Sequence, residues 1–213
     1  MDTHELSTKG AILSIDHSNF SAYGRVLNYD ASEAIAFIES NVILPEAGNA
    51  YVAGDAKLES VAVIKQIGRE VFAELPIQAG WCVGRLRAMN GMEWHKSSEV
   101  IVACSNMVLL LGKYSDIIED TYDSAKAEAF YVKKGSVIEL NPYTLHLAPL
   151  NMGDGFAAII VLPSKTNLAL SGGIDGTLRA INKWLLVHNE HKVGIAGGGK
   201  IGIVGENITL IAK

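Results

Sequence analysis

Two histidines and two glutamates have the residue types and spacing that suit metal chemistry. In the stretch Glu93-Trp94-His95-Lys96-Ser97-Ser98-Glu99, two carboxylates and one imidazole occupy alternate positions, so on an extended chain they project from the same face. On a straight strand at ~3.3 Å per residue the two carboxylates would lie about 20 Å apart, so the chain must fold back at residues 96–98 for them to converge. Together with His146, these residues predict a site for a divalent transition metal such as manganese, iron, zinc or nickel.

Each of these residues also has a plainer interpretation. A single histidine is more often structural, and an acidic residue beside a turn, such as Glu93, is commonly just solvated. Glu99, however, leads directly into the apolar run Val100-Ile101-Val102-Ala103, and an unpaired carboxylate in a buried strand is costly. This position favours a ligand role for Glu99.

The composition limits the class of protein. The chain has 213 residues, of which 49% are hydrophobic, and this is enough apolar material for one domain with a sizeable core. The net charge of −5 leaves no basic excess for nucleic acid, and no apolar run approaches the roughly 18 residues that span a bilayer. Without a recognisable export signal at its start, the chain is expected to be a soluble cytoplasmic protein that acts on a small molecule.

The secondary-structure pattern predicts a single domain over residues 1–213 with a β-rich core at about 75–165. Helices are expected over residues 31–40 after Asp30, over residues 55–68 after Asp55, and late in the chain from Asp175 and Thr177 to about Val187. Core strands are expected at 77–84, 98–111, 129–132, 136–140 and 156–162, with short strands near 201–204 and 208–211. The glycine-rich tail contains the Gly-x-Gly-x-x-Gly pattern of dinucleotide-binding proteins at residues 197–202. We do not assign that function, because too few residues follow Gly202 for the helix, second strand and acidic residue that such a fold requires.

The metal-type residues resemble the two motifs of the cupin superfamily. The first cupin motif is His-x-His followed by a Glu, and the run from Glu93 through His95 to Glu99 fits it with Glu93 in place of the leading His. In the second motif a Gly precedes a Pro-containing turn and a His eleven positions later, as Gly135, Pro142 and His146 do. The resemblance implies a mainly β fold, a double-stranded β-helix or jelly-roll barrel with a few peripheral helices.

A wider resemblance covers most of the chain. The sequence is similar to an uncharacterised bacterial cupin-like family, a domain of unknown function. The similar stretches are residues 20–27, 76–82, 92–100, 144–149, 182–185 and 205–208. Cupins with related metal sites include sugar isomerases, epimerases, dioxygenases, lyases and non-catalytic binders, so the resemblance implies a fold more firmly than a reaction.

The leading functional hypothesis is a metal-dependent enzyme that isomerises or epimerises a sugar or sugar acid. The metal would stabilise an enediolate while a nearby base moves the proton. Candidates for the acid or base are Glu93, if it is not a ligand, with Lys96 and Tyr143 beside the two motifs. Glu139, two residues before a turn, is a further candidate for proton transfer or substrate binding.

Two arginines complete the predicted site. Arg85 and Arg87 alternate on the strand before the metal motif, so they could face the barrel mouth and bind an anionic group; ordinary surface charge explains them equally well. The alternatives to an isomerase are a non-catalytic carbohydrate-binding or sensing cupin, and a lyase or oxygenase on the same barrel. A homodimer is expected, because cupins often pair and exposed β edges favour association.

Overall fold

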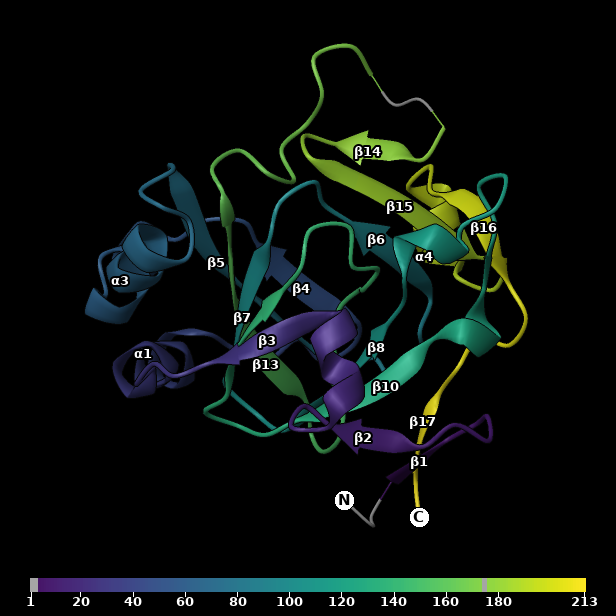
Figure 1. Cartoon of the computed structure of the whole chain (residues 1–213), viewed down its shortest axis with the longest axis horizontal. Helices are drawn as coiled ribbons and strands as arrows, with labels where there is room; N and C mark the ends of the chain where they lie inside the picture. The colour runs from purple at the N-terminus through teal and green to yellow at the C-terminus, as the bar shows by residue number, and fades with distance from the viewer. Residues whose placement is uncertain (1–3, 174–175) are drawn as a thin grey trace.

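Two facing sheets form the centre of the computed structural model, which describes residues 4–173 and 176–213 (Figure 1). The six-stranded sheet has the order β3 (Gly24–Leu27), β11 (Val137–Leu140), β7 (Glu99–Ala103), β13 (Phe156–Pro163), β5 (Ile77–Gly84) and β4 (Asn49–Val52). The four-stranded sheet has the order β12 (Leu150–Asn151), β8 (Met107–Leu111), β10 (Glu128–Val132) and β2 (Ile12–Ser14). All neighbours are antiparallel except β10 and β2. The predicted mainly β jelly-roll class is confirmed.

Strict alternation along the central strands explains how the sheets pack. In β7, Ile101 and Ala103 face the cluster between the two sheets, whereas Val100 and Val102 face the outer cluster. Successive strand residues point to opposite faces, so Glu99 belongs to the same face as Ile101. The strand therefore directs this carboxylate into the space between the sheets.

Three helices cover the outer face of the six-stranded sheet (Figure 1). These are α1 (Ser32–Asn41), α2 (Ala56–Glu59) and α3 (Ala62–Glu70). Asp55 caps α2 as expected by accepting from the amides of Lys57 and Leu58. The single helix expected over residues 55–68 is nevertheless broken, because the Ser60 hydroxyl donates to Lys57 O and Val61 is extended.

The C-terminal region forms a third sheet against the outer face of the four-stranded one. Its strands are β14 (Leu178–Ala180), β15 (Lys183–His188), β16 (Lys200–Val204) and β9 (Tyr122–Asp123), and β6 (Gly91–Trp94) also pairs with β15. Leu186 and Ile203 of this sheet pack with Val108 and Leu110 of β8.

The prediction of a late helix that ends near Val187 is wrong, because this segment forms β14 and β15. Asn182 adopts the left-handed conformation with φ 56°, which turns the chain between β14 and β15, and β15 then bonds β6 on one side and β16 on the other. Sheet neighbours thus take the backbone groups that a helix would pair internally. Of the two expected caps, Asp175 lies outside the described residues.

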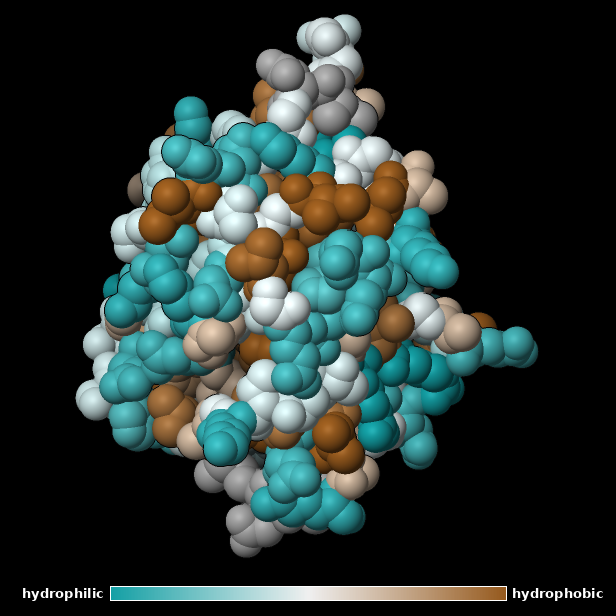
Figure 2. All heavy atoms as spheres, turned by 90° about the vertical axis from the view of Figure 1, so that its right-hand side faces the viewer, coloured by the Kyte–Doolittle hydropathy of each residue, from teal (hydrophilic) through white to brown (hydrophobic). Residues whose placement is uncertain are grey.

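The remaining elements are short. The first and last described strands pair as β1 (His4–Leu6) and β17 (Leu210–Ala212), and α4 (Lys192–Ala196) precedes the strand expected near 201–204. The short 3-10 turns are η1 (Ser18–Ala22), η2 (Tyr114–Asp116) and η3 (Ser124–Lys126). In the part of the chain that the structure describes, no helix is long and apolar enough to cross a membrane. Figure 2 shows a mixed face on which apolar groups are separated by hydrophilic side chains.

The contact between β4 and β5 predicts a strong effect of one added methyl group. A Cβ at Gly80 would lie 1.8 Å from Val52 O, whereas a Cβ at Gly153 would meet nothing within 4 Å. We expect Gly80→Ala to lower the free energy of unfolding by about 2 kcal/mol or more, as overpacking does, and Gly153→Ala to change it by less than about 0.5 kcal/mol. Urea unfolding measures both variants, and equal stabilities would contradict this close approach.

Candidate metal centre

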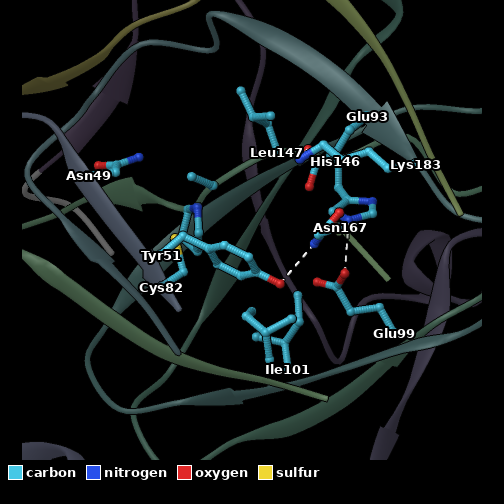
Figure 3. Close-up of a pocket in the computed structure, with 13 residues that line it drawn as sticks. Asn49, Tyr51, Cys82, Glu93, Glu99, Ile101, His146, Leu147, Asn167 and Lys183 are labelled. Atoms are coloured by element: carbon cyan, nitrogen blue, oxygen red, sulfur yellow. Dashed lines mark hydrogen bonds and ion pairs between the residues drawn. The ribbon is translucent and has the colours of Figure 1, made fainter. Parts of the chain in front are cut away.

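A cavity of about 200 Å³ opens from the core between the two main sheets. One wall is apolar and includes Ile101, Ile160 and Pro149. Figure 3 shows that Glu93, His146 and Lys183 lie together on one side of the cavity, and that Glu99 lies beside Ile101. A mainly apolar lining with a few polar groups is typical of sites for small molecules.

The backbone fixes Glu93 and His146 side by side. The Glu93 amide donates to His146 O at 2.6 Å, and the His146 amide donates to Glu93 O at 3.0 Å. Glu93 lies in β6 between the buried residues Met92 and Trp94, so alternation turns its side chain to the other face, toward the cavity. The two cupin-like motifs therefore meet through a pair of main-chain hydrogen bonds.

Both imidazoles are oriented by main-chain carbonyls. His95 Nδ1 lies 2.7 Å from Asn182 O, and His146 Nδ1 lies 2.8 Å from Thr144 O. If each Nδ1 carries the hydrogen and donates it, each neutral ring presents a bare Nε2 to the cluster. A carbonyl behind the ring is the usual support of a metal-binding histidine.

The distances between donor atoms suit a shared ion. Glu99 Oε2 lies 3.3 Å from both His95 Nε2 and His146 Nε2. Two donors that share an ion at ~2.1 Å lie about 3.0 Å apart at octahedral angles and about 3.4 Å apart at tetrahedral angles. Glu93, His95 and His146 also offer ligand atoms that all lie within 4.8 Å of one another.

One nitrogen in the cluster has no hydrogen-bond partner among the described residues. His95 Nε2 is buried and makes no hydrogen bond there, although Glu99 Oε2 lies 3.3 Å away. A buried polar atom without a partner is costly unless a ligand or ion satisfies it. Two nitrogens and two carboxylates are also the donor chemistry of divalent transition metals, so the residues present fit such an ion.

Mutual charge stabilises the cluster without an ion as well. Burial alone would raise the pKa of the Glu99 carboxyl, but His146 and His95 lower it far below its usual range. Burial opposes a charge on His146, yet the carboxylates of Glu99 and Glu93 raise the pKa of His146 to about 9. Lys183 Nζ contacts Glu93 Oε2 and, against the effect of burial, helps to lower the pKa of Glu93.

The structure brings only part of the predicted site together. The four predicted ligands Glu93, His95, Glu99 and His146 converge. Lys96 and Tyr143 do not line the cavity: the exposed Lys96 lies over the Trp184 ring at 5.2 Å, and Tyr143 is 39% exposed.

The other three predicted residues also point elsewhere. Glu139 lies in β11 between the inward-facing Ile138 and Leu140, so it faces outward, where it pairs with Arg25 at 2.7 Å. Arg85 donates to the main-chain carbonyls of Pro45 and Asp154, and Arg87 donates to Gly153 O. Neither arginine lines the cavity.

Several residues of the site carried no recognisable pattern in the sequence. Asn182 lies in the turn before β15 and Lys183 is the first residue of β15, in a segment that was expected to be helical; Asn167 follows β13 in an irregular segment. Asn49 and Tyr51 lie in β4, where alternate residues face inward opposite Gly84 and Cys82. The alternation Asn49-Ala50-Tyr51-Val52 was the available signal for this strand.

Two facing sheets with a buried cluster of histidines and glutamates between them are the arrangement that the resemblance to cupins led us to expect. The chain belongs to the family described as Domain of unknown function (DUF4867), whose model matches residues 12–208. This confirms the expected membership in a family described as a domain of unknown function.

Similarity to solved structures is partial and distant. For oxalate decarboxylase from Bacillus subtilis, identity is 18%, the TM-score is 0.32, and the match covers 45% of this chain and 23% of that one. For the 11S globulin from Wrightia tinctoria the values are 12%, 0.35, 58% and 27%. For the plu4264 protein from Photorhabdus luminescens they are 18%, 0.29, 42% and 64%. The chain thus spans about a quarter of the decarboxylase and globulin chains. No protein among the curated sequences matches it.

The raised pKa of His146 predicts a pH dependence of the metal-free protein. Its folded value of about 9 exceeds the ordinary 6.5, so its contribution to stability is complete below about pH 6.5 and is lost as the pH rises to about 9. This loss amounts to about 3 kcal/mol at most. We expect urea unfolding in the presence of a chelator to show this decline between pH 6 and pH 9 for wild type. The variant His146→Gln should show a smaller slope, and equal slopes would contradict the ion pair.

The side chain of Asn182 is predicted to position His95. It accepts from Lys96 N at 2.9 Å and donates to Ser97 Oγ and Thr166 Oγ1 at 2.9 and 3.1 Å. Asn182→Gly keeps the left-handed backbone but removes these bonds, so metal affinity should fall about 10-fold to 100-fold. Competition with a chromogenic chelator measures this. Asn106→Gly, which removes a similar bond to Lys134 N away from the cavity, should bind metal like wild type. Unchanged affinity in Asn182→Gly would refute the positioning role.

Proposed function

We propose that the chain is a metal-dependent enzyme that isomerises or epimerises a small sugar or sugar acid, with sugar acids preferred. The observation that supports this most is the convergence of two imidazoles and two carboxylates beside a partly apolar cavity. Glu99, His95 and His146, with Glu93 at their side, would hold the ion. When bound, a divalent manganese, iron, zinc or nickel ion supplies positive charge that favours an enediolate.

Lys183 is the group that we assign to proton transfer. It lines the cavity and contacts Glu93, whereas the predicted Lys96 and Tyr143 lie outside it. The Glu93–Lys183 pair can pass a proton between a carboxylate and an amine at the polar side of the cavity. Such a pair is suited to moving a proton between neighbouring carbons.

The size and charge of the cavity favour a small anionic substrate. A volume of about 200 Å³ is below the ~300 Å³ at which pockets for drug-sized ligands begin. The charges of Glu93 and Glu99 balance a divalent ion, and Lys183 then leaves an excess of about one positive charge. A monoanionic sugar acid therefore complements the site better than a neutral sugar.

Metal content and turnover test the proposal together. Purified wild type should contain about one divalent transition-metal ion per chain by elemental analysis, and His95→Ala and His146→Ala should lose most of it. His17→Ala, which alters an exposed histidine, should retain the metal. The loaded protein should interconvert at least one pair in a panel of aldoses, ketoses and uronates, and Lys183→Met should lower that rate about 100-fold or more while keeping the metal.

The possible outcomes test the metal site, the reaction and the role of Lys183 separately. Metal absent from wild type, or retained in both histidine variants, would refute the metal site. Bound metal without turnover of any panel member would refute the isomerase and favour the non-catalytic binding or sensing cupin, or a lyase or oxygenase. Full activity in Lys183→Met would refute the role of Lys183 alone.

A further inference from the structure

The cavity contains an amide whose carbonyl oxygen is unsatisfied. Asn167 Nδ2 donates to the Tyr51 hydroxyl at 2.8 Å, but Asn167 Oδ1 is buried and finds no donor among the described residues. A buried acceptor without a donor is unfavourable, and native structures normally satisfy it with protein, water or ligand. Because Asn167 lines the cavity, a molecule in the cavity can supply the missing donor.

Tyr51 offers the complementary group. Its hydroxyl oxygen accepts from Asn167, and no acceptor for its own hydrogen occurs among the hydrogen bonds of the described residues. Burial is the main factor that raises the pKa of Tyr51, so the phenol stays neutral and can donate. Figure 3 shows its hydroxyl directed into the cavity toward Asn167, on the side away from Asn49.

The surrounding chain holds both groups in place. Tyr51 lies opposite Cys82 in the register of β4 and β5, which turns it inward, and with 41% exposure it lies where the cavity meets solvent. Asn167 has φ 70°, and its amide donates to Ile181 O at 3.0 Å. A left-handed backbone secured by such contacts suits a residue whose side chain must keep one direction.

We propose that Tyr51 and Asn167 form a subsite that binds one hydroxyl group of the substrate. The substrate hydroxyl donates to Asn167 Oδ1 and accepts from the Tyr51 hydroxyl, so a single alcohol satisfies both groups. A carboxylate has no hydrogen to donate to Asn167, and a methylene group can satisfy neither partner. This inference rests on the proposed function, because it assumes that the substrate is a sugar acid. It places one hydroxyl of that substrate at Tyr51 and Asn167 and its reacting end near Glu99 and His146.

Binding of matched ligands tests the subsite without turnover. The probes are D-glucuronate, D-galacturonate and their monodeoxy analogues, titrated calorimetrically into the metal-loaded protein. For wild type, removal of the recognised hydroxyl should weaken binding about 10-fold or more, because two protein groups lose their partner. In Tyr51→Phe and in Asn167→Gly, the same deoxy analogue should bind about as well as its parent. Glycine is chosen at position 167 because it keeps the left-handed backbone.

Controls separate this subsite from folding and from the reaction. Tyr114→Phe changes an exposed tyrosine outside the cavity and should discriminate like wild type, and all variants should keep their metal content. The subsite is refuted if both variants still discriminate, if wild type does not, or if no uronate binds. Discrimination lost in the variants without any uronate turnover would refute the isomerase but support the subsite. Turnover with unchanged discrimination would refute the subsite alone.

Discussion

The carboxylate of Glu99 between two imidazoles is the interaction on which the site depends. Glu99, His95 and His146 are each no more than 5% exposed, and a lone charge at that depth would be strongly unfavourable. Each group therefore requires the others or an ion. Main-chain carbonyls lie at hydrogen-bond distance from the Nδ1 atom of both rings, so only the Nε2 atoms can interact with Glu99 or with an ion. The rest of the fold has to deliver these atoms to one point.

Two parts of the structure place the side chains of the site. The main sheets supply Glu99, the apolar wall and, from the edge strand β4, Tyr51. The C-terminal sheet supplies Lys183 and, through the turn at Asn182, the carbonyl behind His95. The jelly roll is thus only one component of the site, and the third sheet provides both a charge and an orienting group.

The fold and the four metal-type residues could be predicted from the sequence because their signals lie within short segments of the chain. The β7 region is apolar on both faces after Glu99, and the spacing from Gly135 to His146 is contained in one strand and turn. Lys183, Tyr51 and Asn167 could not be found in this way, because they reach the cavity through pairings between distant segments. The helix expected near Val187 failed for the same reason: its apolar residues pair with β6, almost a hundred positions earlier.

The pairing of β15 with β6 also couples local stability to ligand geometry. Trp184 lies opposite Trp94, and Leu185 lies opposite Glu93. The strand β6, which carries Glu93, therefore pairs directly with β15 of the C-terminal sheet. Partial opening of that sheet would remove the partner of Glu93 and the support of His95 in one event. The candidate metal centre and the C-terminal sheet therefore share β6, so an ion held by Glu93 would also stabilise the pairing of β6 with β15.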